Sequence, residues 1–518
     1  MNKTPYKKLD KRQKKLERTK VTVSLAPNSP VRNISAMQAL HAATKYRDEN
    51  KYESAQYICL QLLGHNYASI DASIIMLEMA VDLQRPAETN EFCERLLKVS
   101  PKQLHAAVAL AKAFRTLNKH DAALNVIERA LKANPSSCAL RHMLATYLIE
   151  VNEIDRAETE LRTIIRIDSK FMPAYQQLAA LDALTEDEIA WLEQVEFNGD
   201  DRISTLTSLA TVYRRKKNAD KEINYLNLAQ AELANKTNWQ SVDFSDEAQA
   251  TIDTFNTNFF SKHRQNTENR RQPIFIVGMP RSGSTLTEQI LETNKDVEAI
   301  GESTLLQCIV QDFCKSKFSG TPFLESATRF EDDDIAQIAT DYSNQVSRIY
   351  TQAPIFIDKQ LNSYMYLGIL HLAFPYAKFI HTLRNPLDNC LSCYQQVFDR
   401  MEASRSLESL AKMYKAHLNL MDHWKNLLSD RIFTARYEDM ISNPRHQSQA
   451  LFDFCGIPWN EDFLNFYANK TAIKTASLMQ VRQPIYSTSV EKWRRYESHL
   501  EPVMRVLGLE PNCAGADG

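Results

Sequence analysis

The sequence has no long apolar run and no excess of charge of one sign, and we expect no secretory signal. Its 518 residues carry a formal net charge of −2, which excludes a global attraction to nucleic acid or to an anionic membrane. No apolar run approaches the ~20 residues that a membrane-spanning helix needs. The basic N-terminal stretch KKLDKRQKKLERTK is not followed by the apolar segment of a signal peptide. We therefore expect a cytoplasmic protein without a membrane span or a nucleic-acid partner.

Cysteine is also scarce, and its nine residues have no disulfide-like spacing. The one C-x-x-C pair, Cys390 and Cys393, lies in an apolar stretch that is typical of a helix. Two buried thiols are favoured there over a metal or redox pair. A reducing compartment is expected, and no metal site is predicted.

Glycine is nearly absent from the first half of the chain. Only Gly64 and Gly199 precede residue 273, and the other nine of the eleven glycines follow it. A segment of about 270 residues with so little glycine predicts an almost entirely helical structure. The chain is too long for one ordinary core, so at least two domains are expected.

The helical half repeats with a period of 34 residues. One small-residue position recurs at Ala55, Thr89, Ala123 and Ala157. The best unit runs from Leu104 to Pro135, where the proline ends the second helix of the pair. This pattern resembles tetratricopeptide repeats, about four of them between residues 36 and 185, with a degenerate repeat or cap at 209–229. A generic helical bundle is the alternative. A solenoid of this kind offers a concave groove for a peptide or a partner protein.

From residue 273 the pattern changes to short apolar runs separated by helical periods. The runs IFIVG, VEAIG, IFIDK, KFIHTLR and IFTARYEDM predict strands of an α/β domain with a mainly parallel sheet. Ligands of such sheets bind at the carboxyl ends of the strands. The predicted boundaries are a disordered arm at 1–35, a helical domain at 36–235, a connector at 236–272, the α/β domain at 273–510 and a tail at 511–518.

The stretch PIFIVGMPRSGSTLTEQIL has the outline of a phosphate-binding loop without its lysine. Gly278, Gly283 and Thr285 fit G-x-x-x-x-G-K-[ST], but Ser284 replaces the lysine and Arg281 stands inside the loop. Backbone N–H groups at a helix N-terminus bind phosphate without a lysine. A lysine and Mg²⁺ are required only when a γ-phosphoryl group is transferred. The loop therefore predicts a ligand whose 5′-phosphate carries a less charged group, such as a sulfonate, near Arg281.

FIVGMPRSGSTL resembles the loop of the sulfotransferases that use 3′-phosphoadenylyl sulfate (PAPS). Within that family it is most similar to the tyrosylprotein sulfotransferases and their bacterial relatives with tetratricopeptide repeats. The resemblance extends over residues 273–505. It implies a P-loop-like α/β sulfotransferase domain, with PAPS as co-substrate and no metal. The loop residues implied to bind the 5′-phosphosulfate are Arg281, Ser282, Gly283, Ser284 and Thr285.

FIHTLRNPLDNCLSCYQQ resembles the element of the family that binds the 3′-phosphate. Arg384 and Ser392 have its spacing, and they supply a guanidinium and a hydroxyl suited to a terminal phosphate. Relatives carry a second arginine where this chain has Gln396. Tyr437, in ARYEDMISNP, matches a tyrosine that touches the cofactor, although ordinary core packing explains it equally well.

EAIGEST resembles the element that carries the general base of the tyrosylprotein enzymes. The resemblance implies that Glu302 takes the proton from the acceptor hydroxyl. Taken alone, a Glu at this place is more typical of a carboxylate that caps a helix. In IFIDKQ, the family assigns Lys359 to stabilise the leaving oxygen. Asp358 beside it has a purely structural interpretation.

KTASLMQVRQPIYSTSVEKWRRY resembles the C-terminal element of the family. Ser477 and Lys492 are 15 residues apart, as are the serine and lysine that lie near the cofactor in relatives. The resemblance implies that Ser477 assists departure of the leaving group, and Arg482 is a further candidate for the cofactor phosphates. Trp493 walls the adenine in one interpretation and belongs to the core in the other.

The match is weaker where the acceptor would bind. Ile300 and Ile357 stand where the secreted enzymes have a cysteine pair, and Thr304 and Cys308 replace arginines that read acidic residues beside the target tyrosine. The hypothesis is a PAPS-dependent sulfotransferase whose acceptor is a polypeptide tyrosine or, second, a carbohydrate or small-molecule hydroxyl. A P-loop kinase and a non-catalytic scaffold are the rival classes, and a homodimer stays open.

Overall fold

The structure is a computed structural model that describes residues 11–510, except 28, 50, 66–67, 100–103, 241–242, 267–270, 399–400 and 469–487. The chain forms two compact units, residues 1–140 and residues 141–518, and each is considered by itself. Among the helices of the described residues, none combines the length and the apolar character that crossing a membrane requires.

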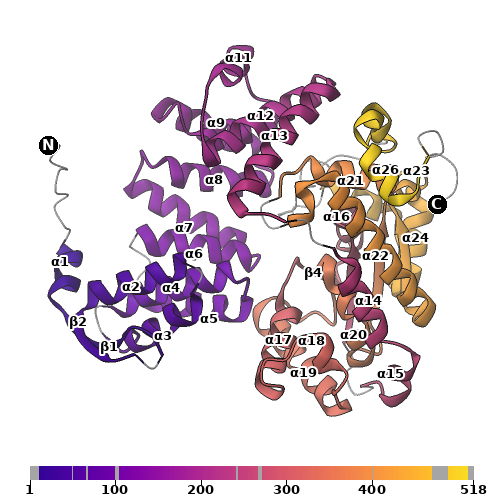
Figure 1. Cartoon of the computed structure of the whole chain (residues 1–518), viewed down its shortest axis with the longest axis horizontal. Helices are drawn as coiled ribbons and strands as arrows, with labels where there is room; N and C mark the ends of the chain where they lie inside the picture. The colour runs from indigo at the N-terminus through magenta and orange to yellow at the C-terminus, as the bar shows by residue number, and fades with distance from the viewer. Residues whose placement is uncertain are drawn as a thin grey trace. The chain divides into compact units, whose positions relative to one another are not determined.

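The first unit is built from pairs of antiparallel helices, as the 34-residue period predicts (Figure 1). Its helices are α1 (Lys11–Arg18), α2 (Ala36–Asp48), α3 (Tyr52–Leu62), α4 (Ser69–Asp82), α5 (Pro86–Val99), α6 (Leu104–Thr116) and α7 (His120–Ala133), and α8 (Cys138–Glu150) crosses into the second unit. The recurring small residues Ala55, Thr89 and Ala123 are fully buried, as is Ala157 of the second unit. Small side chains at this position therefore let paired helices approach, and the predicted repeats are confirmed.

Secondary structure begins within the N-terminal segment, which corrects the prediction of a disordered arm for this part of 1–35. Strand β1 (Lys20–Ser24) pairs antiparallel with β2 (Val31–Ser35) after helix α1. Val21 and Val23 face inward and are buried, while the Gln61 side chain bonds the backbone N–H and C=O of Ser24 at 2.9 and 3.0 Å. The basic composition hid this alternation, because charged and polar residues occupy the exposed positions.

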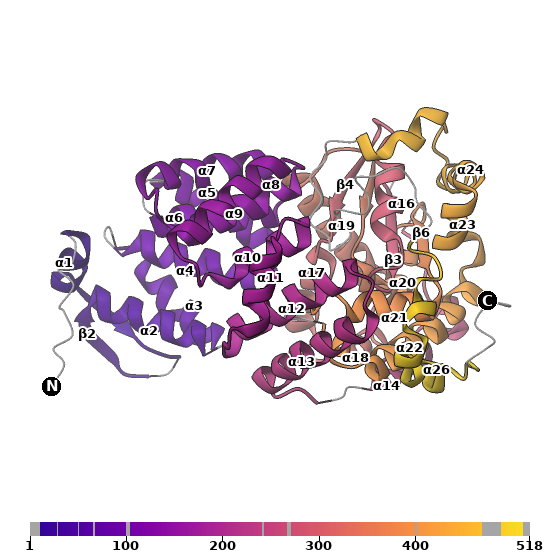
Figure 2. The same cartoon turned by 90° about the horizontal axis from the view of Figure 1, so that it is seen from above.

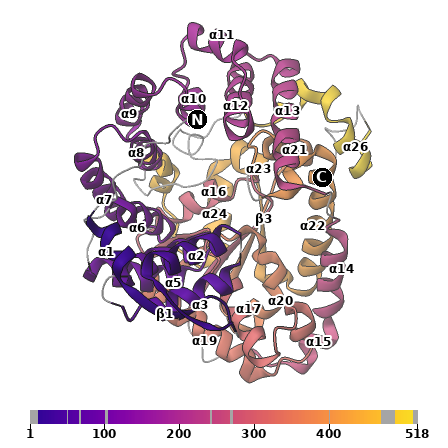
Figure 3. The same cartoon turned by 60° about the vertical axis from the view of Figure 1, so that its left-hand side comes forward.

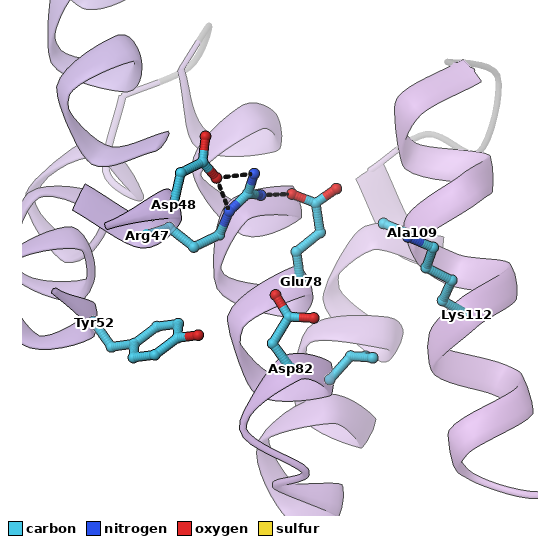
Figure 4. A pocket seen from close by; sticks show the side chains of 8 residues that line it. Arg47, Asp48, Tyr52, Glu78, Asp82, Ala109 and Lys112 are labelled. Carbon is cyan, nitrogen blue, oxygen red and sulfur yellow. Dashed lines mark hydrogen bonds and ion pairs between the residues drawn. The ribbon is translucent and has the colours of Figure 1, made fainter. Parts of the chain in front are cut away.

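A pocket of about 250 Å³ opens between helices α2, α3, α4 and α6 of the first unit (Figure 4). Arg47 lies between two carboxylates, at 2.8 Å from Asp48 and in an ion pair with Glu78. Asp82 and Lys112 complete the charged lining. Arg47 and its two carboxylates compensate one another within the pocket. The peptide partner of the repeats stays a prediction.

The second unit joins helices of the repeat region to the α/β domain, so the compact units do not divide at the predicted boundary of residue 235. Its first helices are α9 (Ile154–Ile167), α10 (Met172–Leu181), α11 (Glu186–Gln194), α12 (Gly199–Arg215) and α13 (Ala219–Thr237). Helices α12 and α13 are the pair predicted at 209–229 as a degenerate repeat or cap. Ala210, Ile223 and Leu226 on this pair belong to a buried cluster of the α/β domain. This shared core places the two helices with the α/β domain.

The predicted connector forms two short helices that pack on the α/β domain. They are α14 (Ser245–Thr254) and α15 (Thr257–Lys262), and α14 runs beside α22 (Leu407–Leu427) (Figure 3). Phe255 between them is fully buried, with its ring centroid 4.9 Å from that of Phe259 and 5.9 Å from that of Trp424. These aromatic contacts explain how a polar segment is anchored.

A five-stranded parallel sheet forms the centre of the α/β domain, and all five predicted strands are confirmed (Figure 2). In sheet order they are β4 (Val297–Gly301), β5 (Ile355–Asp358), β3 (Gln272–Gly278), β6 (Lys378–Leu383) and β7 (Ile432–Arg436). Because every pair is parallel, all carboxyl ends lie on one edge of the sheet. The chain first adds strands on one side of β3 and then on the other. The edge beside β3 is therefore the expected ligand crevice.

Helices cover the sheet and form the connections between its strands. They are α16 (Ser284–Leu291), α17 (Leu305–Lys317), α18 (Phe323–Ala327), α19 (Asp332–Ile349), α20 (Leu367–Ala373), α21 (Pro386–Tyr394), α22, α23 (Tyr437–Ser442), α24 (Pro444–Cys455) and α26 (Glu501–Leu507). Short 3₁₀ helices are η1 (Leu361–Tyr366), η2 (Glu402–Arg405), η3 (Ser429–Arg431), η4 (Glu461–Ala468) and η5 (Lys492–His499). The strands bury residues such as Ile274, Ile276 and Ile380 between these layers.

Candidate active site

The loop between β3 and α16 is shaped by two glycines at its ends. Gly278 has φ +149° and lies so close to Thr382 that an added Cβ would meet the Thr382 carbonyl oxygen at 2.6 Å. Gly283 has φ +99°, and its Cβ would meet the Tyr437 ring at 2.8 Å. Between them, Ser282 Oγ bonds the Met279 carbonyl at 2.6 Å and Thr382 Oγ1 at 2.7 Å. The loop is thus fixed against β6 and leads directly into the N-terminus of α16, where an anion is favoured.

Arg281 adopts a strained backbone conformation inside this loop. Its φ of 66° lies in the left-handed region, which costs a non-glycine residue free energy and persists where surrounding contacts impose it. Two contacts impose it here. Arg281 Nε donates to Ser392 Oγ at 3.1 Å, and the Arg281 carbonyl accepts from Arg384 at 3.1 Å. The 5′ loop and the predicted 3′-phosphate element are therefore one connected structure.

Arg384 follows β6 and is buried beside the loop. Its guanidinium donates to the Ser489 carbonyl at 2.6 Å and lies 4.7 Å from the centroid of the Tyr437 ring. The Tyr414 hydroxyl donates to its carbonyl at 2.6 Å. Arg384 Nε is buried and has no acceptor among the described residues. A buried guanidinium N–H of this kind is a donor prepared for an anionic ligand.

Lys492 opens η5 near the same cluster. Its Nζ donates to Gln395 Oε1 at 3.2 Å, just beyond the C-terminal end of α21. Burial lowers the pKa of Lys492 to about 8, and positive neighbours that include Arg384 contribute to this decrease. A partly buried cation among positive neighbours gains from a bound anion, as expected of a phosphate contact.

Glu302 and Lys359 follow the adjacent strands β4 and β5 and form an ion pair. Lys359 Nζ lies 2.8 Å from Glu302 Oε1 and 3.6 Å from Glu288 Oε2. Burial alone would lower the pKa of Lys359, but these two carboxylates raise it above its usual value, so the lysine is charged. The Lys359 side chain is 1% exposed, whereas that of Glu302 is 50% exposed. The pair thus offers a protected cation and an accessible carboxylate.

Glu288 is the member of this cluster that sequence reasoning missed. It lies one turn after Thr285 on α16, a helix whose residues are all buried. It connects the phosphate-loop helix to Lys359. No signal in the sequence marked it, because α16 (STLTEQIL) is rich in polar residues and its complete burial is seen only in the structure.

Asp358 supports the strand through contacts of its own. Its Oδ2 accepts from the Tyr342 hydroxyl at 2.5 Å, and its Oδ1 accepts from the Gln360 N–H at 3.0 Å. Burial raises the pKa of Asp358 to about 7. These contacts agree with the structural interpretation of this residue.

Other predicted residues have different outcomes. Ser477 and Arg482 lie outside the described residues. Trp493 is buried in the apolar cluster around α21, which supports its interpretation as a core residue. The Tyr437 ring lies against Gly283 of the phosphate loop and under the Arg384 guanidinium, so Tyr437 packs beside the loop.

The cysteine pair of α21 is buried, as the apolar stretch around it predicts. Both Cys390 and Cys393 are free thiols, and the Cys393 thiol contacts the Pro280 carbonyl at 3.2 Å. Among the described residues, no three His, Cys, Asp or Glu side chains gather in a way that could hold a metal ion.

Comparison with known proteins agrees with both parts of the chain. Residues 273–461 match the model of a sulfotransferase family, and residues 115–181 match that of the tetratricopeptide repeat. An uncharacterized protein of Aquifex aeolicus (strain VF5) is 30% identical over 410 residues, which are 77% of this chain and 54% of that protein. A protein-tyrosine sulfotransferase of Drosophila melanogaster is 25% identical over 270 residues, which are 47% of this chain and 53% of that protein. The chain therefore spans about half the length of both relatives.

Among solved structures, the sulfotransferase domain of the Synechococcus PCC 7002 olefin synthase is 22% identical, with a TM-score of 0.32 over 45% of this chain and 90% of that one. The strand order, the lysine-free phosphate loop and the family match concern the same segment. Residues 273–461 are a sulfotransferase-family domain, in a chain that also carries tetratricopeptide repeats.

Proposed function

We propose that this chain transfers a sulfonyl group from PAPS to an acceptor hydroxyl, with a polypeptide tyrosine as the first acceptor. The observation that carries the proposal is the Glu302–Lys359 ion pair at the carboxyl ends of β4 and β5. Glu288 connects this pair to the helix that follows a lysine-free phosphate loop. A base and a protected cation beside an anion site are the parts that sulfonyl transfer needs.

The residues present fit the donor. Arg384 supplies a buried Nε–H that has no acceptor in the described part of the chain. Ser392 accepts from Arg281, whose carbonyl in turn accepts from Arg384. Lys492 donates to Gln395, which comes three residues after Ser392. We assign Arg384, Ser392 and Lys492 to the 3′-phosphate. Residues 281–285 are assigned to the 5′-phosphosulfate, since they end in a helix N-terminus that favours an anion. The bound donor supplies the sulfonyl group on its 5′-phosphate.

The chain's own side chains then divide the work. Glu302 accepts the proton of the acceptor hydroxyl while that oxygen forms a bond to sulfur. The bond from sulfur to the bridging phosphate oxygen breaks, and Lys359 stabilises the charge that develops on this oxygen. The products are a sulfate ester, adenosine 3′,5′-bisphosphate and a proton on Glu302, which returns to solvent. The half-exposed Glu302 can reach an acceptor from outside, whereas the buried Lys359 cannot.

Binding of the donor product is the direct test. We expect adenosine 3′,5′-bisphosphate to bind without Mg²⁺ and more tightly than ATP–Mg²⁺ in isothermal titration calorimetry. Arg281→Ala should weaken this binding by about 10²-fold, since a charge-assisted contact contributes about 1.5–3 kcal/mol and the loop also loses its link to Ser392.

Arg445→Ala is the matched control, because this arginine forms an exposed ion pair with Glu461 and its side chain is 63% exposed. Its affinity should equal that of the wild type. Preference for ATP–Mg²⁺ would refute the donor assignment and favour a kinase, whereas an undiminished affinity in Arg281→Ala would refute the assignment of Arg281 to the donor.

The acceptor is tested with two peptides that differ in one residue. A tyrosine peptide incubated with the enzyme and PAPS should gain one sulfonyl group by mass spectrometry, and its phenylalanine counterpart should not. The relatives called protein-tyrosine sulfotransferases support this choice. Transfer to a carbohydrate or a small phenol but not to the peptide would instead favour the alternative acceptor, a carbohydrate or small-molecule hydroxyl. The repeats are proposed to bind a polypeptide, which serves as acceptor or partner.

A further inference from the structure

A buried carboxylate lies where helices α12 and α13 meet the donor site. Glu222, on α13, is fully buried. Its Oε1 accepts from Arg214 Nε at 2.6 Å and from Gln395 Nε2 at 2.8 Å. Its Oε2 accepts from the Tyr496 hydroxyl at 2.5 Å. One carboxylate thus bonds to α12, to the residue that follows α21 and to η5. Removing such a charge from water is costly unless partners of this kind compensate it.

The segments that Glu222 bonds are those that carry proposed phosphate contacts. Gln395 comes three residues after Ser392, and its Oε1 accepts from Lys492 Nζ at 3.2 Å while its Nε2 donates to Glu222. Arg214 also donates to the Gln395 carbonyl at 3.1 Å. The Gln395 amide therefore links the carboxylate to Lys492.

The negative charge of Glu222 also favours the charged form of Lys492, in addition to the link through Gln395. Burial is the main cause that lowers the pKa of Lys492 to about 8. Arg214, Arg495 and Arg384 also lower it, and Glu222 is the neighbour that raises it. Without the Glu222 charge, a larger fraction of Lys492 would be neutral at pH 7–8 and unable to attract a phosphate.

Packing holds this junction rigid. Ile223 and Leu226 of α13 share one buried cluster with residues of α21 and η5 and with Met279 of the phosphate loop. Two further hydrogen bonds join α13 to Tyr394, whose hydroxyl donates to Asn227 at 2.6 Å and whose carbonyl accepts from Gln230 at 3.3 Å. Figures 1 and 3 both place α13 beside α21.

We propose that Glu222 is a positioning residue of the donor site: through Gln395 and Tyr496 it fixes the two segments that carry Ser392 and Lys492. The repeat-region helices α12 and α13 are then part of the donor site of the enzyme. This inference rests on the proposed function, since it concerns the same site. It also answers how the site compensates for Gln396, where relatives have a second arginine: a carboxylate outside the family domain keeps Lys492 charged and in place.

Glu222→Gln tests the proposal, because glutamine keeps the shape and removes the charge. Calorimetric titration of the full chain with adenosine 3′,5′-bisphosphate from pH 6 to pH 9 gives the readout. Phosphate binding favours protonated Lys492, so affinity is full below the pKa of the free enzyme and falls as the pH rises through it. We expect the midpoint of this fall near pH 8 in the wild type and at lower pH in the variant. A decrease of one pKa unit weakens binding about tenfold above both midpoints.

Steady-state kinetics of Glu222→Gln should show an effect on donor binding and not on the chemical step. The KM for PAPS should rise by about the same factor, with kcat at saturating donor changed less than about twofold, because Glu302 and Lys359 are untouched. Gln395→Leu, which cuts the link to Lys492 but keeps the Arg214–Glu222 pair, should weaken binding without the loss of the Glu222 charge. This second variant keeps the test valid if Glu222→Gln folds poorly.

Asp334→Asn is the matched control. Asp334 is also a buried carboxylate paired with a cation, Lys317. It lies on α19, and its ion pair with Lys317 does not involve the segments that carry Ser392 and Lys492. It should lose stability and keep the wild-type affinity and pH profile. If folded Glu222→Gln and Gln395→Leu both bind the bisphosphate as the wild type does at every pH, the proposal is wrong. If the wild type itself does not bind the bisphosphate, the proposed function fails instead.

Discussion

Glu302→Gln is expected to lower the rate of sulfonyl transfer by about 10²–10⁴-fold, the usual contribution of a general base. Glutamine keeps the size of the side chain but cannot accept the proton of the acceptor. Lys359 retains the Glu288 carboxylate at 3.6 Å, so the cation stays in place and the donor site is unchanged. The affinity for adenosine 3′,5′-bisphosphate should therefore equal that of the wild type.

Glu298→Gln is the matched control, because Glu298 lies on the same strand β4 but is exposed to solvent. An unimpaired rate in Glu302→Gln would contradict the assignment and direct attention to Glu288, the other carboxylate beside Lys359.

Lys359→Met is expected to reduce kcat by about 10²–10³-fold, the typical loss when one electrostatic contact to a developing negative charge is removed. It should also destabilise the protein by about 3–5 kcal/mol, because the buried Glu288 loses this cation. Glu288 and Lys359 are 8% and 1% exposed, so solvent compensates little of this loss. Denaturant unfolding and steady-state kinetics measure the two effects separately.

A double variant separates stability from catalysis. Glu288→Gln combined with Lys359→Met removes both buried charges, so most of the lost stability should return. The rate should stay low, because no cation faces the leaving oxygen. If the double variant regained the wild-type rate, Lys359 would be only the counter-ion of Glu288, and its catalytic assignment would be abandoned.

Local patterns of the sequence predicted the parts of the fold that local patterns determine. The short apolar runs predicted the strands, and Glu302, Lys359 and Arg384 follow β4, β5 and β6 at one edge of the sheet. The roles predicted for these three residues came from the resemblance to the family. The contact of Arg281 with Ser392 joins residues 111 positions apart, yet the order of family elements brought both into the prediction.

The features that were missed depend on long-range packing. Glu222 bonds Gln395 across 173 residues, and nothing near either residue marks the pair. Glu288 is one of five polar residues on a short helix, and only the position of β5 makes it a partner of Lys359. The N-terminal hairpin was hidden because Val21 and Val23 supply most of its inward face within a strongly basic stretch. Composition alone cannot detect two valines that alternate with polar neighbours.

The apolar cluster that α12 and α13 share with α21 and η5 bears on how the α/β domain of this chain can be fused to other proteins. A fragment cut at residue 273 would leave bare the surface that Ala210, Ile223 and Leu226 cover, and it would deprive Tyr496 and Gln395 of their carboxylate. Such a fragment would be prone to aggregate and poor in donor affinity. Leu209 and Val212 of α12 are in turn buried against Met172 and Tyr175 of α10. The portable module therefore begins before α12, and gene fusion must transfer the helices of the second unit together with the α/β domain.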